Sequence, residues 1–500
     1  MNILLIYGPS RRGKGGFVMP LGLLYVGRII ESCGHNAKIF DPHIDDVELA
    51  DFDDFGKLDK IIEDFNPTVI GFSGIATSYG RVKKLSYHIK DRYPNILQIA
   101  GGPLSSVYEL LLTKTRIDLV FHGETEISLP FFLEKLKNKE PFYDTSGISY
   151  FHDGRIIKNQ PPKQITDLDT VPFPAYHLID IHQYLRSIED RLDTYKLLIN
   201  TNPHYSGRTK RIGNKKSYFS IVTSRGCTHR CLFCYRHMIG VRQHSVAYVI
   251  KHMKYLTETY RIEGFAFEDE LFNTNPEWVL EFCDAIDNAN PDIFYFVNGA
   301  RVDKVNETML KRLKETGCIE INYGHESGSD LILKEYRKGV TSQLNKEITL
   351  LTKRIGLICP VQIVIGSPKE TNATINETVQ FLKDVDAYQY SINYLIPLPE
   401  TLIWKYVEEH KLIGDTEIYL DQVAEHGGDP LVNLTQMPNK IWKNWRMLIR
   451  KELKLHYYKK TNLRAYYLLY IFYMIMEKII FFIPAHIIRR FIPKQIRAWF

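Results

Sequence analysis

The sequence has few cysteines for its length and no spacing that suggests pairs of them. Seven cysteines in 500 residues exclude a disulfide-stapled secreted scaffold and favour a reducing cytoplasm. Residues 1–7 have no basic stretch before their apolar run, so we expect a first strand here and not a signal peptide. There is no low-complexity tract and no internal repeat. The length predicts two or three globular domains.

Basic character is missing from most of the chain. The net charge is +6, but residues 440–500 hold 14 Lys and Arg against Glu452 and Glu477, a net charge of +12. Residues 1–439 therefore carry a net charge of −6. This excludes a basic surface spread over the whole protein, and we expect no nucleic-acid partner.

A clean apolar run long enough to span a membrane is also missing. Residues 465–476 are apolar on all sides, but Glu477 and Lys478 separate them from residues 479–484, whereas a spanning helix needs about 20 apolar residues. Aromatic apolar faces flanked by basic residues fit a helix lying in an anionic membrane interface. A C-terminal helical bundle packed on the rest of the protein is the alternative. We expect a cytoplasmic protein, with peripheral contact at the inner face of the membrane left open.

Short apolar strands alternate with amphipathic helices in the first part of the chain. The expected strands are 3–7, 36–40, 68–73, 97–100 and 118–121, and the expected helices are about 21–33, 58–65 and 79–92. This order predicts an α/β domain over residues 1–140 with a doubly wound, Rossmann-like parallel sheet and a ligand at the carboxyl ends of its strands. The turns at those ends let a large flat or phosphate-bearing ligand come close to the backbone. Their candidate binding residues are Ser73, Gly74, Gly101, Gly102, Gly123 and Glu124.

Three cysteines lie within eight residues, Cys227, Cys231 and Cys234, with the spacing C-x3-C-x2-C. Three thiolates on one tight loop can bind three irons of a [4Fe–4S] cluster and leave the fourth iron open to a ligand. A zinc knuckle or chance clustering is the alternative, although structural zinc usually takes four protein ligands and only His229 is nearby. The isolated cysteines of the second half are expected to be core residues: Cys283, Cys318 and Cys359.

Strands and helices alternate again from about residue 217 to 410, which predicts a partial (β/α)6 barrel of the TIM type within residues 216–425. Residues 141–215 are expected to link the two domains, and residues 426–500 to form a basic helical C-terminal region. Within the linker, residues 178–216 are either a helix with a mobile loop over the active site or a spacer. Barrels carry their chemistry at the carboxyl ends of the strands. The candidate residues there are Glu268, Asp269, Arg301, Glu326, Ser327 and Gln362.

The cysteine loop, with Phe233 directly before its third cysteine, resembles the signature of the radical SAM superfamily. The resemblance implies that the open iron chelates S-adenosylmethionine (SAM), which an electron from the cluster cleaves to a 5′-deoxyadenosyl radical. The glycine turns, taken with residues 20–25 and 34–35, resemble the cobalamin-binding domain that precedes many radical SAM cores. The chain is thus identified as a member of the cobalamin-dependent, class B methyltransferase-like radical SAM family.

This resemblance also implies roles for the strand-end residues. Glu268 or Asp269 stands where other members contact the SAM amino group, although a polar cap for the next helix is an alternative. Arg301 matches an arginine that faces the SAM carboxylate, or it neutralises Asp303 or Glu268. Glu326 matches a glutamate at the SAM ribose or amino group. The strand that holds Gln362 resembles the one that borders the adenine, and Phe233 and Ser327 complete the motifs.

Three positions depart from the family pattern, and one motif is missing that this family variant often lacks. His325 replaces a usual isoleucine, as either a proton acceptor in the cavity or a packed histidine. Lys369 and Glu400 replace glycines towards the substrate end of the barrel, so substrate specificity does not carry over. The lower cobalt ligand motif D-x-H-x-x-G is absent from the loop after the first strand, and His43 follows the second strand, where it is expected to be a surface residue.

The function that the resemblance implies is methylation of an unactivated carbon of a hydrophobic substrate, with a [4Fe–4S] cluster, SAM and cobalamin as cofactors. One SAM would methylate cobalamin, and a second would yield the radical that activates the substrate. The alternatives are a non-methylating cyclase or oxidoreductase acting on a porphyrin or lipid, and a non-catalytic cobalamin sensor, which the intact cysteine triad disfavours. The expected partners are a small, lipid-like substrate and an electron donor such as flavodoxin or ferredoxin.

Overall fold

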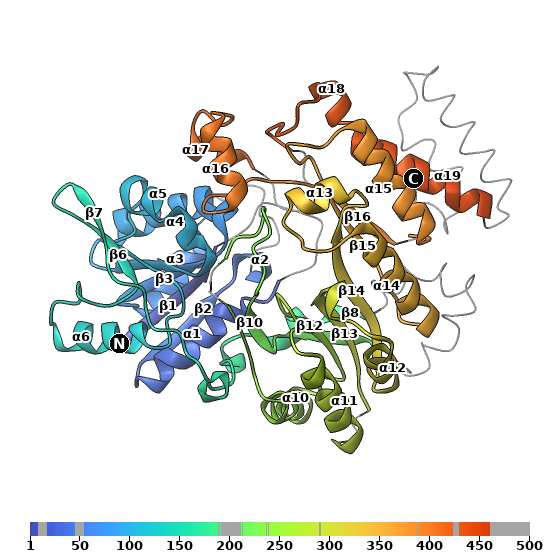
Figure 1. Ribbon diagram of the computed structural model, residues 1–500. Coiled ribbons are helices and arrows are strands. Elements are labelled where there is room, and N and C mark those ends of the chain that lie inside the picture. The colour runs from blue at the N-terminus through green and yellow to red at the C-terminus, as the bar shows by residue number, and fades with distance from the viewer. Residues whose placement is uncertain are drawn as a thin grey trace. The chain divides into compact units, whose positions relative to one another are not determined.

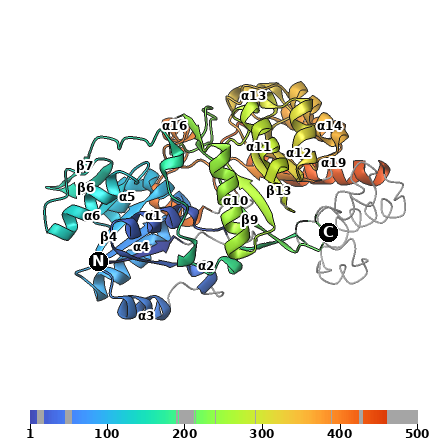
Figure 2. The same ribbon diagram turned by 90° about the horizontal axis from the view of Figure 1, so that it is seen from below.

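The computed structural model describes residues 1–8, 18–45, 55–188, 191, 212, 214–236, 238, 240–289, 292–387, 389–423 and 430–460. The chain divides into two compact units, Met1–Arg446 and Met447–Phe500. The second unit is described only as far as residue 460. The first unit contains a sheet domain, blue in Figures 1 and 2, and a half-barrel, coloured green to orange.

The sheet domain has seven strands in the order β2-β1-β3-β4-β5-β6-β7. The parallel strands are β1 (Asn2–Tyr7), β2 (Asn36–Phe40), β3 (Val69–Ser73), β4 (Leu97–Gly101) and β5 (Leu119–Phe121). Its helices are α1 (Leu21–Ser32), α2 (Pro42–Asp45), α3 (Gly56–Phe65), α4 (Tyr79–Arg92), α5 (Tyr108–Lys114) and α6 (Ser128–Asn138). Leu4 and Ile6 pack in one core and Ile3 and Leu5 in another. Burial on both faces explains why β1 is apolar throughout, and the predicted doubly wound sheet is confirmed.

Two further strands extend this sheet beyond the predicted end of its strands at residue 121. β6 (Ile148–His152) and β7 (Arg155–Lys158) form an antiparallel hairpin on β5. Its turn, Asp153-Gly154, has positive φ at both residues, 46° and 76°, which is the geometry that favours Asp-Gly in two-residue hairpins. Residues 148–158, expected to be part of a linker, therefore belong to the sheet.

The half-barrel contains six parallel strands, which confirms the predicted partial (β/α)6 barrel. The strands are β9 (Ser217–Ile221), β12 (Gly264–Glu268), β13 (Phe294–Ala300), β14 (Cys318–Glu326), β15 (Val361–Ile365) and β16 (Tyr390–Tyr394), with β8 (Arg186–Ser187) antiparallel on β9. Helices α10 (Val246–Tyr260), α11 (Pro276–Ala289), α12 (Glu307–Glu315), α13 (Asp330–Glu335), α14 (Ser342–Ile355) and α15 (Asn372–Asp384) accompany them. Side-chain caps at Ser245, Asn306, Thr341 and Thr371 begin four of these helices. The predicted core cysteines are all buried: Cys283, Cys318 and Cys359.

After the last barrel strand, the chain returns to the sheet domain, as Figure 1 shows for α16 (Leu402–Glu409) and α17 (Thr416–Gln422). The Tyr79 hydroxyl of α4 donates to Glu417 of α17 at 2.9 Å. A Cβ at Gly80 would meet the Asp421 carboxylate, so the glycine allows the two helices to approach. The sequence prediction assigned this segment to the barrel core and missed the contact.

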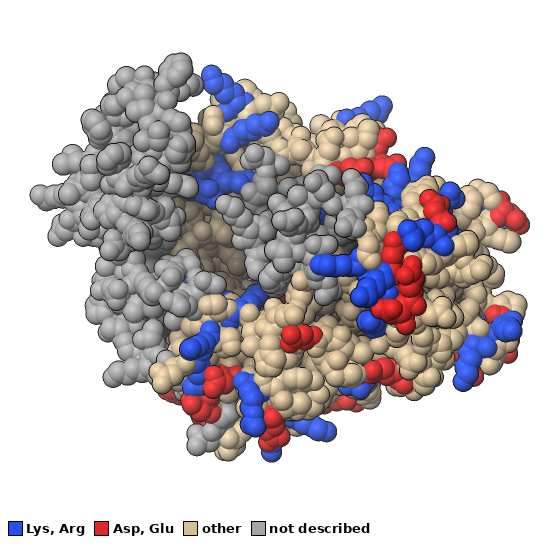
Figure 3. Space-filling model, turned by 180° about the vertical axis from the view of Figure 1, so that it is seen from behind, with Lys and Arg blue, Asp and Glu red and all other residues tan. Residues whose placement is uncertain are grey.

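The helical C-terminal region begins with α18 (Asn439–Trp442) and α19 (Trp445–Lys460). Within the described ranges, no helix is both long and apolar enough to cross a membrane. The apolar stretch 465–476 and most of the 178–216 segment lie outside the described residues. On the face shown in Figure 3, acidic and basic side chains are interspersed.

Candidate active site

The cysteine loop is the loop of a β-hairpin. β10 (Ser224–Gly226) leads into it and β11 (Val241–Gln243) leads out, with Arg225 opposite Arg242. Gly226 has φ +82°, and a Cβ there would meet the Gly240 carbonyl oxygen at 2.3 Å. Only glycine fits this neck without distortion. The sequence predicted β9, which precedes this loop, but neither β10 nor the hairpin.

Within the loop, Cys231 is buried, Cys227 is half-buried and Cys234 is exposed. A hydrogen bond from the Cys234 thiol lowers the pKa of Cys231 against the effect of burial, and raises the pKa of Cys234. The nearby cations Lys338 and Arg301 also favour a thiolate at Cys231. Two cations outside the loop therefore favour negative charge at Cys231, as an anionic cluster site requires.

The described side chains fit a cluster better than a single metal ion. Among them, no three His, Cys, Asp or Glu side chains are placed to hold one ion, and structural zinc needs four ligands on one point. A [4Fe–4S] cluster binds each thiolate to a different iron, so its ligands do not have to converge. Cys227, Cys231 and Cys234 suit that arrangement.

Two ion pairs lie near the cysteine loop, one partly buried and one buried. Arg301 pairs with Asp303 through Nε and Oδ1 at 2.8 Å, and its Nη2 donates to the Lys338 carbonyl at 2.7 Å. Lys338 Nζ in turn contacts Glu326 Oε1 at 2.9 Å. Of the alternatives for Arg301, the structure places it with Asp303. Contact of Arg301 and Glu326 with SAM stays a prediction.

The two acidic candidates after β12 point in different directions. Asp269 Oδ1 accepts hydrogen bonds from the backbone of Thr223 at 2.7 Å and of Ser224 at 2.6 Å. Glu268 lines the cavity described below and pairs with Arg186 of β8 at 3.1 Å. Asp269 therefore holds the strand that enters the cysteine hairpin, while Glu268 lines the cavity and contact of Glu268 with SAM stays a prediction. Glu270, which the sequence prediction did not single out, also lines the cavity.

The other predicted barrel residues occupy different environments. Ser327 is fully buried and bonds to Thr378 Oγ1 at 3.1 Å, and the Phe233 ring packs edge-on against Tyr336. Gln362 is exposed in a strand whose neighbouring side chains are buried. His325 is fully buried, its Nε2 lies 2.8 Å from Thr349 Oγ1, and burial lowers its pKa to about 3. His325 is thus the packed histidine of the two alternatives.

We expect Asp269→Ala to lower the free energy of unfolding by about 3 kcal/mol, because it leaves buried backbone donors of Thr223 and Ser224 without an acceptor. Asp269→Asn should cost about 1 kcal/mol, since its oxygen still serves those donors and its amide can donate to Thr223 Oγ1, which lies 3.2 Å from Oδ2. Urea unfolding of both variants measures the difference. Equal losses in the two variants would contradict this account.

A buried carboxyl also predicts pH-dependent stability. Glu370, in the turn after β15, accepts from the backbone N–H groups of Gly366 and Ser367, and burial raises its pKa to about 8. Since this is above the unfolded value, ionisation destabilises the folded chain from about pH 4.5 to 8, by about 1.4 kcal/mol per pH unit. In Glu370→Gln, the thermal unfolding midpoint should therefore depend less on pH across this window than it does in the natural chain. An identical pH dependence in the two proteins would contradict the assignment.

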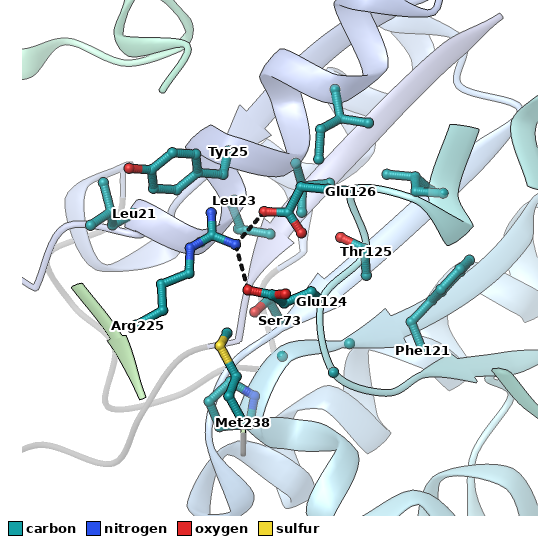
Figure 4. Close-up of a pocket in the computed structure, with 18 of the residues that line it drawn as sticks. Leu21, Leu23, Tyr25, Ser73, Phe121, Glu124, Thr125, Glu126, Arg225 and Met238 are labelled. Carbon is teal, nitrogen blue, oxygen red and sulfur yellow. Dashed lines mark hydrogen bonds and ion pairs between the residues drawn. The ribbon is translucent and has the colours of Figure 1, made fainter. Parts of the chain in front are cut away.

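A cavity of about 340 Å³ opens between the sheet domain and the cysteine hairpin (Figure 4). On one side it is lined by α1 and the carboxyl ends of β3, β4 and β5, and on the other by Val222, Arg225, Met238, Glu268 and Glu270. Five of the six predicted cobalamin residues line it: Ser73, Gly101, Gly102, Gly123 and Glu124. Gly74 is absent from this lining and lies beside Ser78.

The glycines allow the backbone to form this wall. Gly102 and Gly123 have φ of +67° and +68°, which side chains with a Cβ rarely adopt. Gly101 is fully extended, and the nearest atom to a Cβ built there is 3.6 Å away in Phe121. The part of the cavity wall that these glycines form is therefore bare backbone, as close approach of a large flat ligand requires.

Glu124 has partners that the sequence did not predict. Its carboxylate accepts from Arg225 at 3.0 Å and Arg242 at 2.7 Å, and from the Ile165 N–H at 3.1 Å. Burial raises its pKa, but the hydrogen bonds from the two arginines outweigh burial and hold the pKa below its usual value. Glu124 therefore joins the sheet domain to both strands of the cysteine hairpin.

Comparison with known proteins agrees with this geometry. The radical SAM superfamily matches residues 221–382, and the B12 binding domain matches residues 14–132. The chain is 28% identical over 425 residues to an uncharacterized methyltransferase of Pyrococcus horikoshii, covering 83% of this chain and 84% of that protein. It is 22% identical over 437 residues to the anaerobic magnesium-protoporphyrin IX monomethyl ester cyclase of Synechocystis sp., covering 86% and 79%.

A solved structure shares the fold. The radical SAM methyltransferase TsrM from Kitasatospora setae, with tryptophan substrate and the SAM analogue aza-SAM bound, matches with a TM-score of 0.63 and 18% identity, over 82% of this chain and 76% of that one. The same enzyme has been solved with cobalamin and a [4Fe–4S] cluster. The chain belongs to the radical SAM enzymes that carry a B12 binding domain. Its cofactors are a [4Fe–4S] cluster, SAM and cobalamin.

Proposed function

We propose that this enzyme transfers a methyl group from SAM to an unactivated carbon of a small molecule. The observation that carries the proposal is the single cavity shared by the bare strand ends of the B12 domain and the barrel strand ends beside the cysteine loop. When bound, the cluster and cobalamin supply the electron that cleaves SAM and a carrier for its methyl group. The names of the Pyrococcus horikoshii relative and of TsrM support the same reaction class.

Different groups of residues would bind the cluster, bind SAM and exclude water. Cys227, Cys231 and Cys234 hold the cluster at the hairpin tip. Glu268 and Glu270 present carboxylates to the cavity, where they would stabilise the electron-poor amine and sulfonium of SAM. Apolar residues of α1 cover the side of the cavity that faces the sheet and exclude water, which strengthens these charge contacts.

The barrel interior also informs the proposed substrate. Asn322 Nδ2 donates to Asn298 Oδ1 at 2.5 Å and to Glu320 Oε1 at 2.6 Å, and Arg191 pairs with Glu320. This polar network lies along β13 and β14, below the strand ends. We infer a substrate whose apolar body lies against the sheet-domain wall and whose polar groups point towards the barrel.

The membrane and electron-donor proposals rest on surface residues. Met447 and Leu448 are exposed on α19, at 66% and 40%, which supports contact with an apolar, membrane-borne substrate; a chain ending at residue 446 that stays in the membrane fraction would overturn this.

Arg230 in the cysteine loop and Arg337 beside Lys338 are exposed, which supports docking of an acidic flavodoxin or ferredoxin. Cluster reduction by such a donor should then weaken as salt rises.

The second candidate is ring formation without methylation, favoured by the resemblance to the Synechocystis cyclase. Both candidates are tested with anaerobically reconstituted protein, SAM labelled with CD3 at its methyl group, and a metabolite extract. Methyl transfer predicts 5′-deoxyadenosine together with a product that gains the labelled methyl group. Deoxyadenosine without any labelled product would reject the methyltransferase and leave the cyclase.

A further inference from the structure

The neck of the cysteine hairpin is held by two carboxylates of the other domain. Arg225 Nη1 donates to Glu124 Oε1 at 3.0 Å and to Glu126 Oε1 at 2.5 Å, and Arg242 Nη1 donates to Glu124 Oε2 at 2.7 Å. Because Arg225 and Arg242 are cross-strand partners, Glu124 bridges both strands. All four side chains are at least 86% buried, so these ion pairs are poorly screened by solvent.

The same residues form part of the cavity wall. Tyr25, Glu124, Glu126 and Arg225 line it, and the Arg225 guanidinium lies 5.0 Å from the centre of the Tyr25 ring. Figure 4 shows Arg225 reaching across to the two glutamates, with the Tyr25 ring beside it. A ligand filling this cavity would therefore touch the groups that hold the hairpin.

The two glutamates differ in how firmly they are held. Glu124 accepts from two arginines and from the Ile165 N–H, so its position is over-determined. The ion pair described for Glu126 is with Arg225 alone, and its carboxylate faces the cavity. Glu124 thus anchors the hairpin, whereas Glu126 is the contact that a ligand can reorganise.

We propose that Glu126 and Arg225 couple cobalamin binding to the cluster site. Cobalamin in the cavity would restrict Glu126 and Tyr25, and thereby Arg225, which precedes the first cluster ligand, Cys227, by two residues. Glu126 is then a positioning residue that acts through Arg225. The inference rests on the proposed placement of cobalamin and the cluster, but does not depend on methyl transfer. If binding at the two sites is coupled, linkage requires that cobalamin and SAM change each other's affinity by one common factor.

The test uses the full-length, reconstituted protein and measures binding instead of turnover. Cobalamin is titrated by its visible absorption with and without SAM, and the reduced cluster is examined by EPR with and without cobalamin. In the natural chain we expect SAM to tighten cobalamin binding about 5- to 150-fold, and cobalamin to shift the cluster EPR signal. In Glu126→Gln, the factor should fall towards 1 and the shift should disappear, with iron content unchanged and the melting midpoint lowered, because one buried ion pair is lost.

Two further variants separate coupling from simple damage. Arg225→Lys keeps the charge but loses the fork that reaches both carboxylates, so it should also uncouple the sites. Glu140→Gln, on an exposed residue, should behave like the natural chain. Independent binding of cobalamin and SAM in the natural chain would overturn the coupling but leave the methyltransferase intact. Full coupling in Glu126→Gln would overturn the role of this residue. Failure of the natural chain to bind cobalamin would overturn both the coupling and the proposed methyl transfer.

Discussion

Replacing Cys234 with alanine is expected to abolish the cleavage of SAM, with 5′-deoxyadenosine falling to the level without enzyme. Cys234 is one of the three predicted cysteine ligands on the loop, and a cluster held by only two of them would lose iron and the geometry that leaves one iron open. Cobalamin should still bind, because the bare wall of Gly101, Gly102 and Gly123 lies in the other domain. Iron content, the visible spectrum of the reduced cluster and deoxyadenosine by liquid chromatography measure the result.

The matched control for this prediction is Cys33→Ser. Cys33 is also partly accessible, but it follows α1 in the sheet domain, far along the chain from the cysteine loop. This variant should keep full iron content and SAM cleavage. If Cys234→Ala retained a stoichiometric cluster and formed deoxyadenosine at the natural rate, the assignment of the three ligands would be wrong.

Replacing Gly101 with leucine is expected to abolish cobalamin binding and to leave SAM cleavage intact, the reverse of the Cys234→Ala defect. The extended backbone at Gly101 accepts any residue, and a Cβ there has 3.6 Å of clearance, so the protein should fold. The rest of the leucine side chain would then occupy the cavity at the carboxyl end of β4. We expect loss of cobalamin from the purified protein and of methyl transfer, while the cluster remains and SAM is still cleaved. Cobalamin content by absorption and labelled-methyl transfer measure the result.

Gly414→Leu is the control for the leucine itself. Gly414 is exposed, and nothing lies within 4 Å of a Cβ built there, so this variant should bind cobalamin as the natural chain does. Normal cobalamin content in Gly101→Leu would show that cobalamin lies elsewhere. If Gly101→Leu lost the cluster as well as cobalamin, the variant would have failed to fold. The melting midpoint of Gly101→Leu checks this, because a correctly folded variant should melt at the same temperature as the natural chain.

The distance along the chain between cooperating residues explains which parts of the site could be predicted. The spacing of Cys227, Cys231 and Cys234 is local, as are the glycine turns after β3, β4 and β5. Their chemistry could therefore be predicted from the sequence alone. The roles of single strand-end residues are not local. Asp269 and Glu268 are neighbours in sequence, yet one is bound to the backbone of Thr223 and Ser224 and the other faces the cavity.

The sequence by itself determined the two regions of alternating strands and helices and the spacing of the cysteine loop, because hydrophobic periodicity and ligand spacing are properties of short segments. The cofactor set was predicted from the resemblance of these motifs to a known family. Only the tertiary structure decided that α17 packs on α4, and that Glu124 clamps a hairpin instead of only lining the cavity. Glu124 and Arg225 are 101 residues apart, and no local pattern specifies such a pair. Long-range ion pairs depend on how the domains pack, and here that packing joins the cavity at the strand ends of the sheet domain to the cysteine loop.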